Sequence, residues 1–193
     1  MRRTIGFGIL VLAVGVSSLW GQAGESEQTS IKKQERLAFS FQYGGKAFEE
    51  FRAGWAVTAE QRPLDEKRLE RVWTWTEPAG GLAVRYEVIE YPYLAAREWV
   101  VRLENRGERD TEIIEGVWSL DGRLAGDAVV LHYALGDHNS ADSFAPQRKE
   151  LPAGEKAVFS PRAGRSSDPY MPFFNVQGQG GGPADGTQPL FLA

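Results

Sequence analysis

The chain has 193 residues and a formal net charge of −4, with 42% hydrophobic residues, 25% charged residues and no cysteine. A single domain usually takes about 100–200 residues, so this length allows one ordinary domain and leaves little room for a second. The apolar content is that of a globular chain rather than a disordered one. The lack of cysteine excludes disulfides, a thiolate nucleophile and a cysteine-ligated zinc site. The negative charge argues against nucleic acid as a partner.

The first 23 residues have the layout of a secretory signal peptide. A basic start, Met1-Arg2-Arg3, precedes an apolar run over residues 5–16, and the small residues Gly21 and Ala23 follow. The apolar run is short against the roughly 20 residues of a membrane-spanning helix, which favours cleavage over the alternative, an N-terminal membrane anchor. We therefore expect a signal-peptide helix within residues 1–23, export to the periplasm or the medium, and no stable membrane span.

The rest of the chain has the two-residue period of β-strands. After a polar linker over residues 24–36, apolar residues alternate from Leu37 to Tyr43, where a Gly-Gly pair ends the run. Residues 47–52 interrupt the pattern with a helical turn or an irregular edge. The later strand-like segments are residues 55–59, 69–77, 82–91, 99–103, 113–120, 129–133 and 157–160. A Pro-Ala-Gly-Gly turn separates 69–77 from 82–91, so these two are predicted to form a hairpin.

The number and spacing of these segments predict the fold class. About eight strands placed ~8–12 residues apart are typical of an antiparallel sandwich. No stretch carries a sustained 3.6-residue apolar period, which disfavours helical and α/β folds. We predict an all-β fold: an antiparallel β-sandwich over residues 37–182, preceded by the signal-peptide helix and followed by an irregular tail over 183–193.

The two histidines do not predict a metal site. His132 lies in a strand pattern, out of phase with its apolar neighbours, and His138 lies in a polar loop beside Asp137 and Asn139. An Asp-His-Asn run is a weak pattern for a metal, and turn-forming side chains explain the same residues. We expect neither a metal nor a cofactor.

No catalytic motif stands out either. The chain lacks the Gly-x-Ser-x-Gly nucleophile elbow, and its carboxylates show no pairing of the kind that a glycoside hydrolase requires. The Gly-rich segment at residues 178–182 lacks the Gly-Lys-Ser/Thr of a phosphate loop. Most acidic residues are therefore expected on solvated faces.

The aromatic residues allow two interpretations. Six Trp, six Tyr and ten Phe are many for one small core. Sugars stack their C–H faces on such rings, so a carbohydrate-facing sheet is one interpretation, with Trp118 on a later strand. The other is that the rings fill the space between the sheets, where each buries ~150–250 Å². We expect Trp73, Trp75 and Trp99 in the core.

Several segments together resemble the N-terminal β-sandwich domain of bacterial α-galactosidase-like glycoside hydrolases (melibiase-type, clan D). They are Leu37–Lys46, Tyr91-Pro92 with Glu98–Gly107, the loop Ser140–Pro146, and Gly164–Ser167 with Pro172–Val176. The match runs in order from Leu37 to about Gly182. The ordered Ser-Ala-Asp and Pro-Phe-Phe-Asn segments are its most specific part.

The resemblance implies an accessory domain of a large exported enzyme. In that family a supersandwich-like β-sandwich packs on a (β/α)₈ barrel, which holds two catalytic Asp residues of a retaining mechanism. Neither Asp maps onto this chain, because no Lys is followed two residues later by Asp, and a barrel of ~250 residues does not fit. The chain departs from the family pattern after Gly182, and a truncated or frame-shifted gene product is the economical explanation.

Two loops would then face the missing barrel, and they would border the sugar site or only form the domain interface. Their residues are Asp137, His138, Asn139, Asp142, Phe144, Arg165, Phe173 and Asn175. If this interpretation holds, an apolar patch is expected around Phe144, Phe173 and Phe174.

Two functions remain open. The first is an accessory domain of an exported α-galactosidase-like hydrolase, not catalytic by itself, with a catalytic barrel or a galactoside as its partner. The alternative is a free-standing secreted carbohydrate-binding module that uses exposed Trp or Tyr rings. A weaker third is an exported structural or adhesion domain without a ligand.

Overall fold

The computed structural model describes residues 4–12, 37–94, 96–122, 128–137, 139–178 and 190–192. The chain splits into two compact units. Among the described residues, 37–93 and 97–122 make up most of unit 1, and 128–178 make up most of unit 2. The division falls inside the predicted domain 37–182, and whether both units fold as one domain stays a prediction. Within the described part, no helix is long and apolar enough to cross a membrane.

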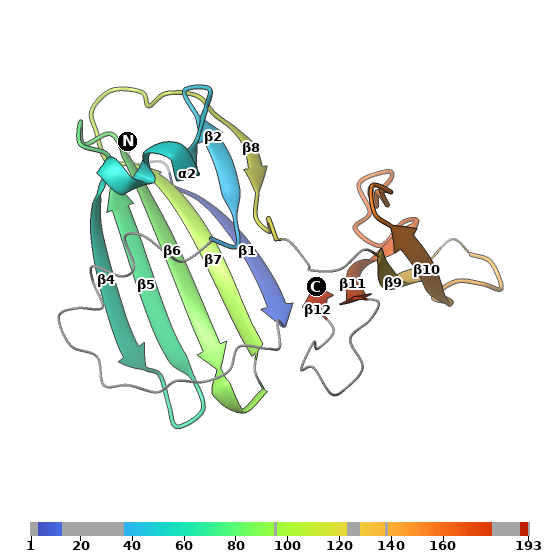
Figure 1. Ribbon diagram of the computed structural model, residues 1–193. Helices are drawn as coiled ribbons and strands as arrows, with labels where there is room; N and C mark the ends of the chain where they lie inside the picture. The colour runs from blue at the N-terminus through green and yellow to red at the C-terminus, as the bar shows by residue number, and fades with distance from the viewer. Residues whose placement is uncertain are drawn as a thin grey trace. The chain divides into compact units, whose positions relative to one another are not determined.

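Unit 1 is a two-layered β-structure (Figure 1). In its larger sheet the strand order is β1 (Thr4–Leu12), β7 (Ala96–Asn105), β6 (Leu82–Tyr91), β5 (Leu69–Thr76) and β4 (Ala56–Pro63). In its smaller sheet the order is β3 (Lys46–Ala47), β2 (Ser40–Tyr43) and β8 (Ile114–Trp118). Its short helices are α2 (Phe48–Phe51), η1 (Arg52–Gly54) and η2 (Pro92–Leu94). The predicted all-β antiparallel sandwich is confirmed.

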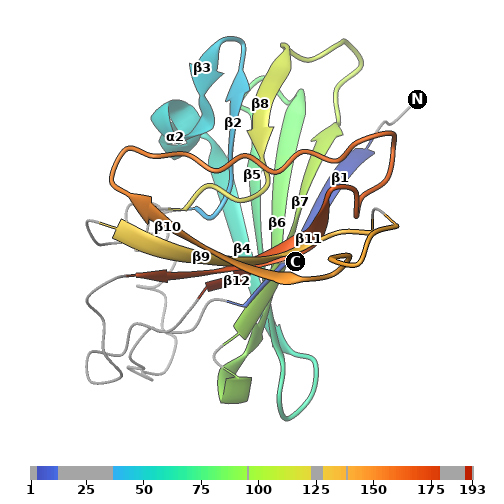
Figure 2. The ribbon, with the colours of Figure 1, turned by 90° about the vertical axis from the view of Figure 1, so that its right-hand side faces the viewer.

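The strands of unit 2 pair antiparallel with one another (Figure 2). Its strands lie in the order β10 (Pro146–Pro152), β9 (Ala128–Leu135), β11 (Tyr170–Gly178) and β12 (Leu190–Leu192). On one face the Phe159 ring lies 4.9 Å from the Tyr133 ring and 4.7 Å from the Tyr170 ring, between centroids. This aromatic cluster gives unit 2 an apolar centre of its own.

The predicted hairpin is confirmed as β5 and β6. Antiparallel pairing places Trp73 opposite Tyr86 and Trp75 opposite Val84, so all four side chains share one face. The turn is closed by hydrogen bonds from the Glu77 amide to the Leu82 carbonyl and from the Gly80 amide to the Glu77 carbonyl. Gly80 has φ +77°, which is why the turn needs glycine there. The alternation of apolar residues and the glycine-containing turn are both local sequence signals, and both predicted this hairpin correctly.

The core of unit 1 lies between its two sheets and is largely aromatic. Phe48, 2% exposed, has its ring centroid 4.6 Å from that of Phe41 and 5.8 Å from that of Trp75. The ring centroid of Phe39, which directly precedes β2, lies 5.0 Å from that of Tyr86 on β6. The expected interruption at residues 47–52 is confirmed as α2 and η1, and it inserts Phe48 between the sheets.

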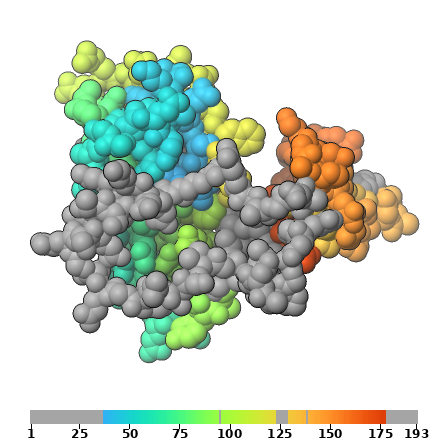
Figure 3. Space-filling model, in the orientation of Figure 1, coloured from blue at the N-terminus to red at the C-terminus, as the bar shows by residue number. Residues whose placement is uncertain are grey.

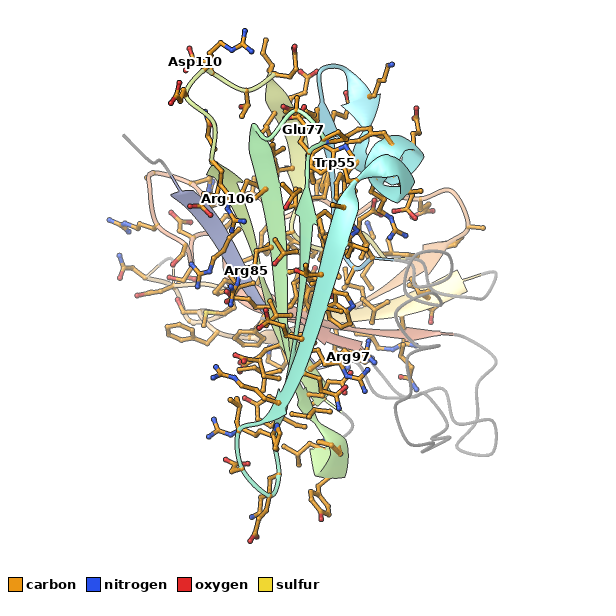
Figure 4. All side chains as sticks on the ribbon, turned by 90° about the vertical axis from the view of Figure 1, so that its left-hand side faces the viewer. Trp55, Glu77, Arg85, Arg97, Arg106 and Asp110 are labelled. Atoms are coloured by element: carbon orange, nitrogen blue, oxygen red, sulfur yellow. The ribbon has the colours of Figure 1, made fainter. Side chains whose placement is uncertain are left out.

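One polar cluster ties the two sheets together at the end of the sandwich where Glu77 and Trp55 lie (Figure 4). The Tyr43 hydroxyl, on β2, donates to the Glu77 carboxylate at 3.2 Å and accepts from the Glu112 amide at 3.4 Å. The Leu82 amide also donates to Glu77 Oε2, at 3.0 Å. Burial of the Tyr43 hydroxyl raises its pKa, and the negative charge of the adjacent Glu77 carboxylate raises that pKa further.

We expect the Tyr43 hydroxyl to make stability fall at alkaline pH. Because its pKa is raised in the folded chain, the folded state keeps the phenol proton where the unfolded state has lost it. The contribution of the protonated Tyr43 phenol to the free energy of unfolding is fully present below about pH 10, and it is lost as the pH rises through the raised pKa. In Tyr43→Phe, urea unfolding at pH 8 and pH 10.5 should show a smaller alkaline loss than in the wild type. Tyr91, whose pKa is raised by its hydrogen bond to Glu98, retains part of the slope. If the free energy of unfolding falls by the same amount between pH 8 and pH 10.5 in Tyr43→Phe and in the wild type, this role of Tyr43 is contradicted.

Four segments differ from expectation. Residues 157–160 are not a strand. β10 forms from residues that no predicted strand covered, and β11 forms largely from a segment expected to be a loop. Both contain proline, which suggests a loop, yet β10 is an edge strand and Pro172 of β11 lies at a register shift, and proline is tolerated in both places. The predicted irregular tail contains β12, which pairs with β11.

The N-terminal predictions fall largely outside the described residues. Residues 13–36, which include the end of the predicted signal peptide and the linker, lie outside them. Where a signal-peptide helix was expected, the described residues Thr4–Leu12 form strand β1. The signal peptide itself and export stay predictions.

Candidate functional site

The loop between β9 and β10 holds most of the predicted site residues. It is closed at its base by a hydrogen bond from the Leu135 amide to the Ala145 carbonyl at 3.0 Å. Asp137 Oδ1 accepts from the Asn139 amide at 3.0 Å and from the Ser143 hydroxyl at 3.3 Å. The Ser140 hydroxyl donates to Asp142. Both carboxylates therefore build the loop itself, as turn chemistry predicts. His138 lies outside the described residues.

The second predicted loop meets the first at a buried glycine. The Gly136 amide donates to the Pro169 carbonyl at 2.7 Å. A Cβ at Gly136 would lie 1.6 Å from the Ser167 carbonyl oxygen, so the two backbones touch only because residue 136 has no side chain. The structure thus brings together the loops that the sequence analysis paired, and it joins them through backbone atoms.

The aromatic residues of these loops differ in exposure. Phe144, with φ +66°, is 58% exposed, and Phe173 is 45% exposed. Phe173 lies at the irregularity of β11 between Tyr170, paired with Leu135, and Phe174, paired with Tyr133. Phe174 is half-buried, with its ring 6.4 Å from that of Phe159, so it does not belong to the exposed patch expected there. Phe144 and Phe173 remain as exposed apolar groups near the Leu135 end of β9.

Asn175 lies on β11 rather than in a loop, which corrects its expected setting. It is paired with His132 of β9, and His132 is paired with Arg148 of β10, so the three share one face of the unit 2 sheet. Sequence reasoning placed His132 out of phase with its apolar neighbours but had no means of finding Arg148 beside it. Arg148 forms an ion pair with Glu150 at 2.9 Å.

Arg165 lies in a loop that is held by its own backbone. Its amide donates to the Arg162 carbonyl at 2.9 Å, and the Arg162 guanidinium pairs with Asp168 at 3.2 Å. Arg165 is exposed, and within the described residues its guanidinium forms no ion pair.

Several carboxylates of unit 1 form ion pairs with arginines. Glu87 of β6 accepts from Arg85 at 2.6 Å and from Arg102 of β7 at 3.2 Å. Arg85 and Arg106 project from the side of the large sheet opposite α2 (Figure 4). Pairs of this exposed kind contribute about 0–1 kcal/mol each.

The pKa shifts of the acidic residues do not favour acid catalysis. The pKa of Asp65 is lowered by hydrogen bonds from the Lys67 amide and the Arg68 guanidinium, and that of Glu70 is lowered by Arg62. A general acid needs a pKa raised toward neutrality, which is the opposite direction. Among the described residues, no group of three His, Asp or Glu side chains could hold a metal ion.

The tryptophans divide into buried and exposed. Trp73, Trp75 and Trp99 are 3–6% exposed, which confirms their prediction as core residues. Trp118 of β8 is 65% exposed. The exposed aromatic rings of the described chain are Tyr93 and Trp118 in or beside unit 1, and Phe144 and Phe173 in unit 2.

Comparisons of the chain with models of known protein families, with curated proteins and with solved structures gave no significant match.

Proposed function

We propose that the chain is a non-catalytic accessory β-sandwich domain of an exported α-galactosidase-like glycoside hydrolase. The observation that supports this most is the junction of the two predicted loops at Gly136. Asp137 and Asp142 are engaged in the loop's own hydrogen bonds, whereas Phe144 and Phe173 are exposed. Exposed apolar side chains beside such a junction suit packing against another domain better than they suit chemistry.

The test of this proposal uses the purified chain and a separately produced catalytic barrel from an α-galactosidase-like hydrolase that lacks its own sandwich. We expect no hydrolysis of an aryl α-galactoside by the chain alone. We expect measurable association with the barrel by calorimetry, weakened at least about tenfold by Phe144→Glu or Phe173→Glu, because a buried charge without a partner is costly at an interface.

The control is Val158→Glu, which introduces the same charge at a side chain that is 76% exposed in unit 2. It should leave association unchanged. Turnover by the chain alone that disappears when its carboxylates are replaced, or no association with the barrel, would refute the proposal.

A second candidate function is a free-standing secreted carbohydrate-binding module. The observation that favours it is Trp118, which is 65% exposed although the other described tryptophans are buried. An exposed indole offers a flat apolar surface beside a polar N–H, and both suit the alternating C–H and O–H groups of a sugar.

A further inference from the structure

Trp118 belongs to a mixed polar and aromatic surface, which is the outer face of the small sheet. In the register of β2 with β8, Ser40 is opposite Trp118 and Gln42 is opposite Glu115. Residues that are directly opposite each other point to the same side of a sheet. Phe39, Phe41 and Tyr43 alternate with Ser40 and Gln42 and are buried on the inner side, so these four residues lie on the outer side.

The four residues form a compact group. Opposite residues have Cβ atoms about 4.5–5.5 Å apart, and positions two residues apart along a strand are about 7 Å apart. Ser40 and Gln42 are two apart, so the Gln42–Glu115 pair lies one step along the sheet from the Ser40–Trp118 pair. In the space-filling view the segments of β2 (blue) and β8 (yellow-green) form part of the visible surface of unit 1 (Figure 3).

A bulge in β8 places the polar groups beside the indole. The register shifts between Ser40 and Gln42, and Gly116, with φ +57°, lies in β8 at this irregularity. A Cβ at Gly116 would lie 3.9 Å from both Cγ and Nε2 of Gln42, so the Gln42 amide extends over Gly116. Glycine satisfies the positive φ and keeps that amide open to solvent.

The polar groups of this face are available to a ligand. Gln42 and Glu115 are exposed, and within the described residues neither side chain has a hydrogen-bond partner. The amide both donates and accepts, and the carboxylate accepts. A flat ring with such groups one step away can stack on one face of a sugar ring while accepting and donating to its hydroxyls.

The chemistry of the face selects the class of ligand. Ser40 and Gln42 are uncharged and Glu115 is an anion, so an anionic ligand would meet repulsion without a cation to offset it. A protein partner needs about 800 Å² of surface on each side with an apolar centre, whereas the exposed apolar side chains here, Ile113, Val117 and Trp118, are few for that. A neutral saccharide requires only the ring and a few hydrogen-bonding groups.

We propose that the outer face of the small sheet binds a neutral saccharide, with Trp118 as the stacking platform and Gln42 and Glu115 as partners of the sugar hydroxyls. This inference gives the second candidate function a location. It does not depend on association with a barrel, which involves Phe144 and Phe173 of unit 2.

The experiment titrates the full chain with neutral oligosaccharides, namely raffinose, a galactosyl-mannan oligosaccharide and cellotetraose, by calorimetry and by tryptophan fluorescence with iodide quenching. We expect saturable binding of at least one of them and protection of an iodide-accessible tryptophan by that sugar. Trp118→Ala should weaken binding at least about tenfold and remove the protected signal, whereas Trp118→Phe, which keeps a ring, should lose less.

Matched variants separate this face from general effects. Gln42→Ala and Glu115→Ala should each weaken binding several-fold, because each removes one hydrogen-bonding group from the surface without burying anything. Tyr93→Ala removes an aromatic ring that is 81% exposed elsewhere and should leave binding unchanged. Thermal melting of each variant checks that it is folded.

Three results would overturn the proposal: no saturable binding of any of these sugars, binding that Trp118→Ala leaves intact, or a concentration-dependent dimer that Trp118→Ala abolishes. The last result would assign the exposed Ile113, Val117 and Trp118 to contact between copies of the chain. Failure of the barrel association test leaves these titrations unaffected, so the two proposals fail separately.

Discussion

Gly136→Ala is expected to unfold unit 2 while leaving unit 1 folded. The added Cβ would lie 1.6 Å from the Ser167 carbonyl oxygen and 2.7 Å from the Ser167 carbonyl carbon, both of which are backbone atoms. Relief requires the two loops to separate, which breaks the hydrogen bond from the Gly136 amide to the Pro169 carbonyl. We expect a loss of about 3–5 kcal/mol in unfolding free energy, above the roughly 1–3 kcal/mol usual for overpacking, because the obstructing atoms are backbone.

Amide hydrogen exchange followed by mass spectrometry measures this effect for each unit. Protection should fall across β9 and β11 and persist across β5 and β6. Gly122→Ala is the control, because a Cβ at Gly122 meets nothing within 4 Å and the residue has no positive φ. Full protection of β9 and β11 in Gly136→Ala would show that the two loops do not touch as described.

Phe48→Ala is expected to cost unit 1 about 3–5 kcal/mol of stability, as is usual for truncation of a buried aromatic residue. Phe48 is 2% exposed, and its ring contacts those of Phe41, Trp55 and Trp75 from both sheets. The cavity would open where α2 inserts between the sheets. Urea unfolding followed by tryptophan fluorescence measures this loss of stability, because two of the neighbouring rings are indoles.

Two further variants calibrate this result. Phe48→Leu fills part of the cavity and should cost less than Phe48→Ala. Leu94→Ala removes an apolar side chain that is 64% exposed and should change stability by no more than about 0.5 kcal/mol. Equal effects of Phe48→Ala and Leu94→Ala would contradict a core centred on Phe48.

The parts of the fold that the sequence predicted are those with local causes. The β5–β6 hairpin follows from alternation and a Gly-containing turn, and Trp73 and Trp75 share a face because side chains in a strand alternate. β10 and β11 were missed because proline weakens the local signal, while their pairing with β9 supplies stability from distant residues.

The candidate sites show the same division. The turn residues Asp137 and Asn139 were recognisable, since their hydrogen bonds span two residues. The junction at Gly136 joins residues about thirty positions apart, and glycine alone does not reveal which backbone will approach it. Likewise Arg148 comes beside His132 only through strand register.

By itself, the sequence determined an all-β sandwich, its hairpin and the core positions of Trp73, Trp75 and Trp99, because a two-residue period and turn residues act over short distances. Only the tertiary structure decided which tryptophan stays exposed, since Trp73 and Trp118 occur in equally strand-like segments and differ only in what covers them. Whether a side chain is covered depends on packing between segments that are distant in the sequence. For that reason the two candidate surfaces, one on each unit, became evident only in the folded structure.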